Sequence, residues 1–296
     1  MATVTNTNVT NPGDIAGLLV NARQDAIFAG YESSIYLPGV LANIYDVPAG
    51  SVTAQIPKFS AIATTDVETE AHNATSAAIA ELDIINVENA GVNVTAQSYA
   101  ARAMLKDLGG ANASGVGTVL GRAVSEKFDT DFSALFSAVD GSSNPLITNG
   151  VGAAGAGLTV ALVAQAVQKV RANKFAGQLW MVLHPSQVED ILLELAGTAA
   201  IPGSGGDAMN EAMREGLVGQ MFGANIVQST SLVKDGSDDF TGCVWAENAV
   251  GIAMFRGLDV TSQTNITGLG TDIVASLHAK AAMVDASRAC RIVSAE

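Results

Sequence analysis

The sequence is poor in the residues on which catalysis, metal binding and nucleic-acid binding most often depend. It has only two cysteines, Cys243 and Cys290, and three histidines. The cysteines form no C-x-x-C pair and the histidines lack i, i+4 spacing, so the sequence carries no zinc motif. Basic residues number 15 against 29 acidic ones, which gives a formal charge of −14. Because phosphate binding needs clustered Lys and Arg, this balance argues against a nucleic-acid-binding protein.

Aromatic residues and long apolar runs are scarce as well. Aromatic residues make up 5% of the chain, whereas apolar residues as a whole make up 48%. We therefore expect a sizeable core that is built mostly from Ala, Val, Leu and Ile. No window of about 18 residues is free of charged or polar breaks, so no membrane span is expected. Residues 1–10 lack the pattern of a signal peptide, and we expect a reducing cytosol with two buried free thiols.

The motifs that could carry chemistry fail the tests of their sequence context. Gly150–Gly155 matches G-x-G-x-x-G, but no good strand pattern precedes it and no acidic residue follows at the required distance. We interpret it as a flexible linker. The three histidines, His72, His184 and His278, are interpreted as a loop residue, a helix-start residue and a strand residue. No catalytic, cofactor-binding or metal-binding residues are therefore expected.

The N-terminal part of the sequence predicts a flexible arm followed by a helix. Residues 1–11 are rich in Thr and Asn and show no periodicity. Apolar residues at three- and four-residue spacing then follow Pro12, and Gly30 is expected to end this helix.

An extended β loop is predicted between residues 50 and 97. Alternating stretches at 51–59, 79–88 and 92–97 have the pattern of half-exposed strands. The stretch 64–78 is acidic and rich in small residues, which is typical of an exposed loop tip. In the first strand we expect Val52, Ala54 and Ile56 to face one side. Pro57 cannot donate a ladder hydrogen bond, so this strand is expected at a sheet edge.

One long amphipathic helix is predicted over residues 114–139. Its apolar residues recur on one face, and about 25 residues give a rod of about 38 Å. The residues of this face are Val116, Val119, Leu120, Ala123, Val124, Phe128, Phe132, Leu135, Phe136 and Val139. Phenylalanines at i, i+4 and i+8 spacing are expected to pack in the core rather than line a ligand groove. Asp129 and Asp131 lie beside this face and are expected to make contacts rather than acid–base chemistry.

The remaining sequence predicts a compact α/β unit. Thr159 is expected to cap a helix, residues 179–183 to form a buried strand, and Pro185 to begin a second helix that runs to Gly197. Residues 221–229 are expected to form a turn that leads into a strand, and further strands are predicted at 243–246, 251–255, 258–263 and 273–283. The apolar end at 286–293 is expected to pack back on the body.

The order of these parts resembles the major capsid proteins of tailed phages, which have the Hong Kong 97-type capsid fold that encapsulin shells share. Leu179–Ser186 resembles the strand–helix start of the axial domain in that family, and Gly219–Ser229 resembles the turn into its next strand. The resemblance implies an α+β fold in four parts. These parts are an N-terminal arm and helix at 1–37, an extended β loop at 45–97, a peripheral domain with a spine helix at 98–150 plus 258–285, and an axial domain at 151–257 plus 286–296.

The resemblance also implies a function. The chain would be the major capsid protein of a tailed double-stranded DNA phage, made in the host cytoplasm and located in the virion capsid. It would assemble with itself into the pentamers and hexamers of an icosahedral shell, and it would be no enzyme and need no cofactor. No long charged helical extension precedes the arm, so a separate scaffolding protein is implied. Portal and decoration proteins and enclosed DNA, bound without sequence specificity, are further implied partners, and no membrane is.

Four residues are the candidate assembly contacts. Ile56 and Phe59 are expected to anchor the β loop on a neighbouring subunit, and Phe128 lies on the apolar face of the long helix. Lys58 is the only lysine in the β loop. Some members of this family join subunits by a Lys–Asn isopeptide bond, but no matching Asn with a nearby acid is evident, so crosslinking is not expected.

Three other functions are compatible with parts of this pattern. An encapsulin-like compartment would enclose cargo protein instead of DNA, and the Thr/Asn-rich arm favours the phage interpretation over it. A tail or surface-layer subunit would form tubes or planar lattices. A cytosolic enzyme is disfavoured because the sequence shows no set of nucleophile, base and orienting residue.

Overall fold

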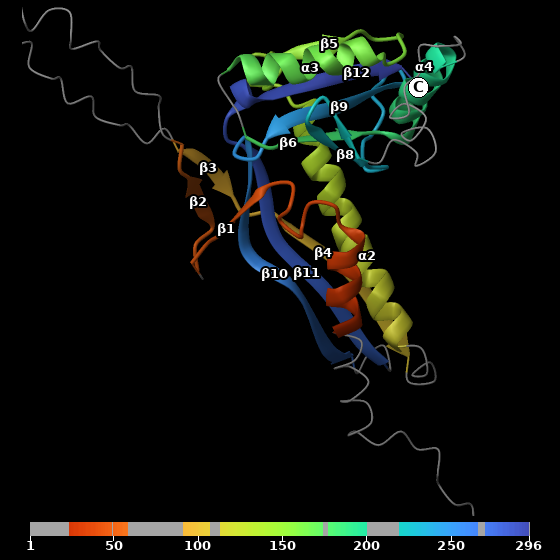
Figure 1. Cartoon of the computed structure of the whole chain (residues 1–296). Helices are drawn as coiled ribbons and strands as arrows, with labels where there is room; N and C mark the ends of the chain where they lie inside the picture. The colour runs from red at the N-terminus through yellow and green to blue at the C-terminus, as the bar shows by residue number, and fades with distance from the viewer. Residues whose placement is uncertain are drawn as a thin grey trace, which may run out of the picture.

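The described part of the protein contains two large β-sheets, one long helix that packs against both of them, and a separate two-stranded ribbon (Figure 1). The computed structural model describes residues 24–48, 50–58, 91–106, 113–173, 177–199, 219–265 and 270–295. The predicted flexible arm, the loop tip at 64–78 and the strand at 79–88 lie outside these residues. No helix in the described ranges is both long and apolar enough to cross a bilayer.

The lower sheet in Figure 1 has four strands in the order β1-β10-β11-β4. They are β1 (Asn43–Asp46), β10 (Val250–Asn265), β11 (Gly270–Met283) and β4 (Ser98–Lys106). β1 runs parallel to β10, and the other neighbours are antiparallel. The separate strands predicted at 251–255 and 258–263 are one strand, because β10 continues through two register irregularities between Met254 and Asp259. The sequence analysis did not predict β4.

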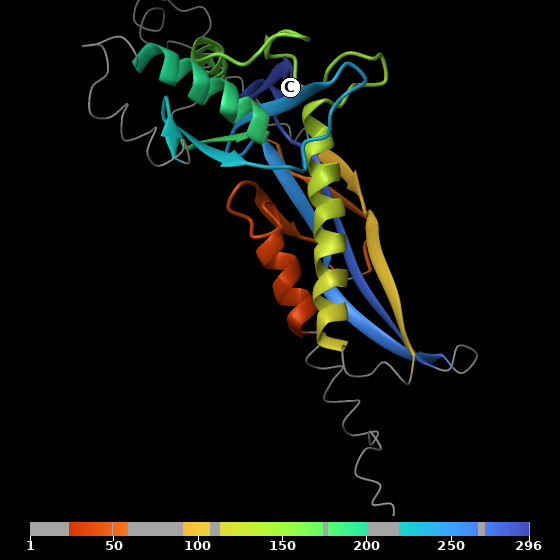
Figure 2. The same ribbon diagram turned by 90° about the vertical axis from the view of Figure 1, so that its right-hand side faces the viewer.

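The helix α2 (Ala113–Ser133) lies along one face of this sheet and continues as a 3₁₀ turn, η2 (Ala134–Phe136) (Figure 2). The prediction of one long helix is confirmed, but its end at Val139 was wrong, because the helical turns stop at Phe136. Val119 is 67% exposed although it was assigned to the buried face. The buried row repeats every four residues from Leu120 to Phe136, and Val119 lies about 100° away from that row.

The upper sheet has six strands in the order β5-β12-β9-β6-β8-β7. They are β5 (Gly150–Gly152), β12 (Ala289–Ala295), β9 (Asp239–Ala246), β6 (Leu179–Leu183), β8 (Ala224–Gln228) and β7 (Gln220–Met221). Two helices, α3 (Val160–Ala172) and α4 (Pro185–Ala199), pack on one face of it. The predicted buried strand at 179–183 and the apolar C-terminal segment are both confirmed.

The helix signals in this half of the chain are borne out, and one linker prediction is wrong. Thr159 caps α3 by accepting a hydrogen bond from the backbone N–H of Leu162, and Pro185 occupies the first position of α4. The segment that starts at Gly150 begins as strand β5, parallel to β12, and not as a flexible linker. Gly152 has a φ of 85° and its α-carbon lies against the carbonyl of Val293, so a side chain would not fit there.

The two sheets share an aromatic core that is centred on α2. Trp245 of β9 is fully buried, and its ring centroid lies 5.2 Å from that of Phe136. Phe132 stacks on Tyr36 at 3.8 Å, and Phe128 meets Tyr99 of β4 edge-on at 5.7 Å. Because this row of rings touches both sheets, α2 fixes how one sheet is held on the other. The free thiols of Cys243 and Cys290 are buried, as predicted.

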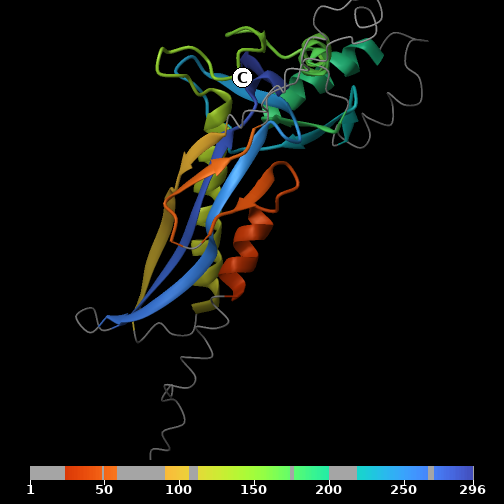
Figure 3. The same ribbon diagram turned by 90° about the vertical axis from the view of Figure 1, so that its left-hand side faces the viewer.

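A helix over residues 24–33 packs beside α2 (Figures 2 and 3). It was predicted to end at Gly30 but continues to Ser33. Gly30 is part of a packing contact and does not end the helix: a side chain at this position would collide with Leu258. On the other side of the contact, the α-carbon of Gly121 lies against the carbonyl of Ala26. Small residues therefore let the two helix backbones approach closely.

Replacing Gly121 with Ala should weaken this helix contact. The new methyl group would meet the backbone of Ala26, and overpacking of this kind costs about 1–3 kcal/mol. Gly115 on the same helix has open space around its α-carbon, so Gly115→Ala should stabilise the protein by roughly 0.5–1 kcal/mol through helix propensity. Urea unfolding of the two variants measures both effects. Equal stabilities would show that the close approach at Gly121 is not important.

Candidate functional site

The candidate site is the base of the predicted β loop, where a two-stranded ribbon meets the body. The ribbon consists of β2 (Thr53–Ile56) and β3 (Val92–Thr95), which pair antiparallel with Ile56 opposite Val92. The predicted strand at 51–59 is thus shorter than expected, and Val52 lies before it with 66% of its side chain exposed. Since each strand has only one partner, β2 is an edge strand, as Pro57 indicated.

A small apolar cluster fixes the ribbon on the lower sheet. Ile56 is 1% exposed and packs with Val94 of β3 against Ala253 and Val284. Burying a side chain of this size contributes about 1.5–3 kcal/mol. Ile56, which the sequence analysis named as a contact to a neighbouring subunit, therefore packs within its own chain. A direct contact to a neighbour stays a prediction.

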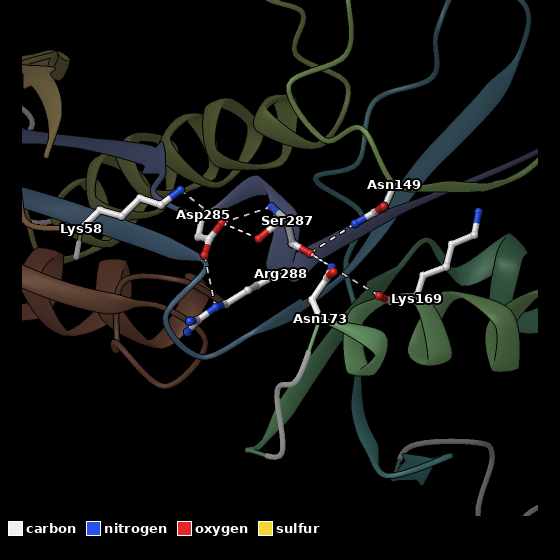
Figure 4. A network of polar contacts seen from close by, with 7 residues as sticks. All are labelled: Lys58, Asn149, Lys169, Asn173, Asp285, Ser287 and Arg288. Atoms are coloured by element: carbon white, nitrogen blue, oxygen red, sulfur yellow. Dashed lines mark hydrogen bonds and ion pairs between the residues drawn. The ribbon is translucent and has the colours of Figure 1, made fainter. Parts of the chain in front are cut away.

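An ion pair fixes the end of β2 to the connection between the two sheets. Figure 4 shows the Nζ atom of Lys58 beside Asp285, at 3.2 Å from Oδ1. The other carboxylate oxygen of Asp285 accepts from Arg288 at 3.1 Å. Burial acts to raise the pKa of Asp285, but hydrogen bonds from Ser287 and the charge of Lys58 outweigh it, so the pKa is lowered. Asp285 is therefore held as a charged acceptor.

The same connection is held from the upper sheet. Residues 286–288 form a 3₁₀ turn, η3 (Ala286–Arg288), between β11 and β12. Asn149 donates from its side-chain amide to the carbonyl oxygen of Ser287 at 3.2 Å, and Asn173 at the end of α3 donates to the same oxygen (Figure 4). The ribbon and the upper sheet thus meet at one short turn.

A second set of polar contacts lies where β3 passes into β4. Gln97 donates to Asp131 of α2 at 2.8 Å and accepts from Lys280 of β11 at 2.6 Å. Asp131 also pairs with Lys127 at 2.8 Å. These contacts join the ribbon to the helix and to the sheet.

A buried carboxylate holds the N-terminal segment on α2. Oδ1 of Asp129 accepts a hydrogen bond from the hydroxyl of Ser34 at 2.6 Å, and Oδ2 accepts from the backbone N–H of Ile35 at 2.9 Å. Burial raises the pKa of Asp129 to about 6, although these hydrogen bonds act in the opposite direction. Asp129 and Asp131 both make contacts within the chain.

The other candidate residues are placed as follows. Phe128 is buried in the aromatic core, as its helical spacing predicted, and Phe59 lies outside the described residues together with His72. His184 precedes α4 and His278 lies on β11, both as predicted. In the described part of the chain, no group of three or more His, Cys, Asp or Glu side chains could hold a metal ion.

Replacing Lys58 with Met should loosen the ribbon without unfolding the protein. The pair is partly exposed, so its loss should cost no more than about 1 kcal/mol of global stability. Backbone hydrogen exchange in residues 53–56 and 92–95 should become faster. Arg102→Met removes a comparable, partly exposed pair between β4 and β11 and should leave exchange in the ribbon unchanged. Equal exchange in both variants would contradict an anchoring role for Lys58.

Asp129 should make stability depend on pH in the direction opposite to most carboxylates. Its pKa is about 6 in the folded protein against an ordinary value of 3.8, so the folded state binds the proton more tightly. The contribution of Asp129 to the free energy of unfolding is complete below about pH 4 and is lost as the pH rises through about 6. Asp129→Asn should therefore gain stability relative to the wild type between about pH 4 and pH 7.

Urea unfolding of the unassembled subunit at several pH values measures this difference. Asp140→Asn is the control, because Asp140 is exposed and its pKa is lowered by hydrogen bonds from Asn144 and Ser142. Its difference from the wild type should stay constant above about pH 5, because the lowered pKa places its titration below that range. A constant difference for Asp129→Asn as well would contradict the prediction.

Comparison with known proteins gives matches at the level of structure. No protein-family model and no curated protein sequence matches the chain. The capsid of cyanophage P-SCSP1u matches with a TM-score of 0.60 and 16% identity, over 86% of this chain and 87% of that one. A structure from Mycobacterium phage Che8 matches with a TM-score of 0.60 and 15% identity, over 82% and 84% of the two chains.

A shell that is not named as a phage capsid is similar too. The holo encapsulin complex from Synechococcus elongatus matches with a TM-score of 0.53 and 8% identity, over 88% of this chain and 87% of that one. Identities this low compare folds, and the matches extend over most of each chain. The protein therefore has the α+β fold of phage capsid and encapsulin shell subunits, which is the fold that the order of its parts predicts.

Proposed function

We propose that the protein is the major capsid protein of a tailed double-stranded DNA phage and that it assembles into the pentamers and hexamers of an icosahedral shell. The observation that carries this proposal is the likeness to phage capsid structures over more than four fifths of the chain. Fold alone does not fix function. The anchored ribbon and the charge of the chain support the same conclusion independently.

The ribbon supports assembly because it is fixed at its base and leads into a long stretch of sequence. Ile56 and Lys58 hold the C-terminal end of β2 in the body, and residues 59–90 follow before the chain returns at β3. A segment of this length, rooted firmly in one subunit, can reach across a neighbour. Phe59 is the anchor residue proposed for that contact.

Closed rings would form if each subunit binds the next one head to tail and the rotation closes. Each contact can be weak, because many contacts form at once and together stabilise the shell. The Thr/Asn-rich residues 1–11 would add a further contact to an adjacent subunit.

The charge of −14 suits a wall around DNA because it repels the packed phosphates. Enclosed DNA would then be confined by the closed shell and would make no sequence-specific contacts with it. A separate scaffolding protein, a portal and decoration proteins complete the set of proposed partners. The mature location would be the virion capsid, after synthesis in the host cytoplasm.

An encapsulin-like compartment is the second candidate, and the match to the encapsulin shell favours it. Such a shell would enclose cargo protein instead of DNA. A tail or surface-layer subunit is a weaker alternative and would form tubes or sheets.

Negative-stain electron microscopy of the purified protein, alone and with a candidate scaffolding protein, tests the proposal. Closed icosahedral particles or rings of five and six are expected. Larger particles that package DNA in infected cells would support the phage capsid, and small uniform particles with protein cargo would support the compartment. A uniform monomer or dimer under both conditions would overturn the shell function.

Deleting residues 64–78 should leave a soluble subunit but impair or alter shell assembly. The reason is that the deletion shortens the segment proposed to lie on a neighbour, while the anchored residues remain. A control variant keeps the length and removes the charge through Asp66→Asn, Glu68→Gln and Glu70→Gln. Sedimentation and electron microscopy compare the products. Normal shells from the deletion variant would remove this segment from the mechanism.

A further inference from the structure

The hairpin between β7 and β8 turns through two residues in an unusual conformation. Met221 pairs with Ala224, so Phe222 and Gly223 form the whole turn. Their φ angles are 52° and 78°. Two consecutive positive φ values in a two-residue hairpin define a type I′ turn, in which Asn-Gly and Asp-Gly are the preferred pairs.

Phenylalanine is a poor choice for the first position of this turn. Bulky side chains rarely adopt positive φ, because the β-carbon then approaches the backbone. The other non-glycine residues with positive φ in the described ranges are Ser143 and Asp238, which are small and polar. Phe222 therefore carries a backbone strain that Asn at the same place would avoid.

Packing against the described residues does not offset this strain. Phe222 is 48% exposed, and it belongs to none of the three apolar clusters found among the described residues. The hairpin is held by other groups: Gln220 donates to Asn225 at 2.7 Å, and the backbone N–H of Ile226 donates to Gly219 at 2.8 Å. Strained residues that do not serve the fold are found most often at functional sites.

The position of the turn suits a contact between subunits. β7 is one of the two edge strands of the upper sheet, so the turn lies at the sheet edge. The guanidinium group of Arg171, at the end of α3, lies against Gly223. The ring of Phe222 is thus presented on a short turn that the body supports.

We infer that Phe222 is an anchor for self-assembly, and that its ring is buried against an apolar surface of a second copy of this chain. The inference rests on the proposed function, in which copies bind head to tail through different faces. Copies that each carry a charge of −14 repel one another, so their contact depends on short-range burial of apolar area. Aromatic side chains are enriched at the centres of such contacts.

The substitution Phe222→Asn separates the two roles that the residue could have. Asn-Gly is a preferred pair in this turn, so the variant subunit should unfold at the same temperature as the wild type or about 2 °C higher. Assembly should suffer, and the protein concentration at which rings or shells first form should rise about tenfold or more. Light scattering and electron microscopy measure the threshold, and calorimetry of the unassembled subunit measures the midpoint.

Val233→Asn is the matched control, because Val233 is a 69% exposed apolar residue whose backbone is not strained. It should leave the assembly threshold unchanged. A Phe222→Asn variant that assembles at the wild-type threshold would overturn the inference and leave the proposed function intact. A lower unfolding temperature for this variant would overturn it too, because Phe222 would then serve its own fold. If the wild type forms no rings or shells, the proposed function and this contact both fail.

Discussion

The row of aromatic rings on α2 is the interaction on which the rest of the molecule depends. Phe132 and Phe136 pack on Trp245 of the upper sheet, whereas Phe128 packs on Tyr99 of the lower sheet. The chain has few aromatic residues, and a large share of them packs together at this one place. Ala, Val, Leu and Ile fill the remaining core, and they fix shape less specifically than interlocked rings do.

Polar contacts then attach the N-terminal segment and the ribbon to this centre. Asp129 holds the segment after the first helix, and Asp285 holds the end of the ribbon. Each carboxylate has at least one partner from a distant part of the sequence. The ion pair of Asp285 adds little stability because it is partly exposed, but it fixes where the ribbon leaves the body.

The sequence predicted those elements whose signals are local. The four-residue repeat of Phe128, Phe132 and Phe136 gave α2, and Thr159 gave the start of α3. β4 was missed because its alanines have low strand propensity and its conformation follows from pairing with β11, about 170 residues away. Asp129 follows Phe128 directly, and this position was a signal that its carboxylate would be buried and would need hydrogen-bond partners. Its partner Ser34 could not be deduced from local patterns.

The path of the backbone between the sheets has a consequence for shape. In the part of the chain that the structure describes, the backbone passes from one sheet to the other three times: after α2, between β9 and β10, and between β11 and β12 through η3. Three covalent crossings and a shared aromatic core leave little freedom for the sheets to bend against each other. In the proposed shell, curvature would then be set at the contacts between subunits and not by bending within each subunit.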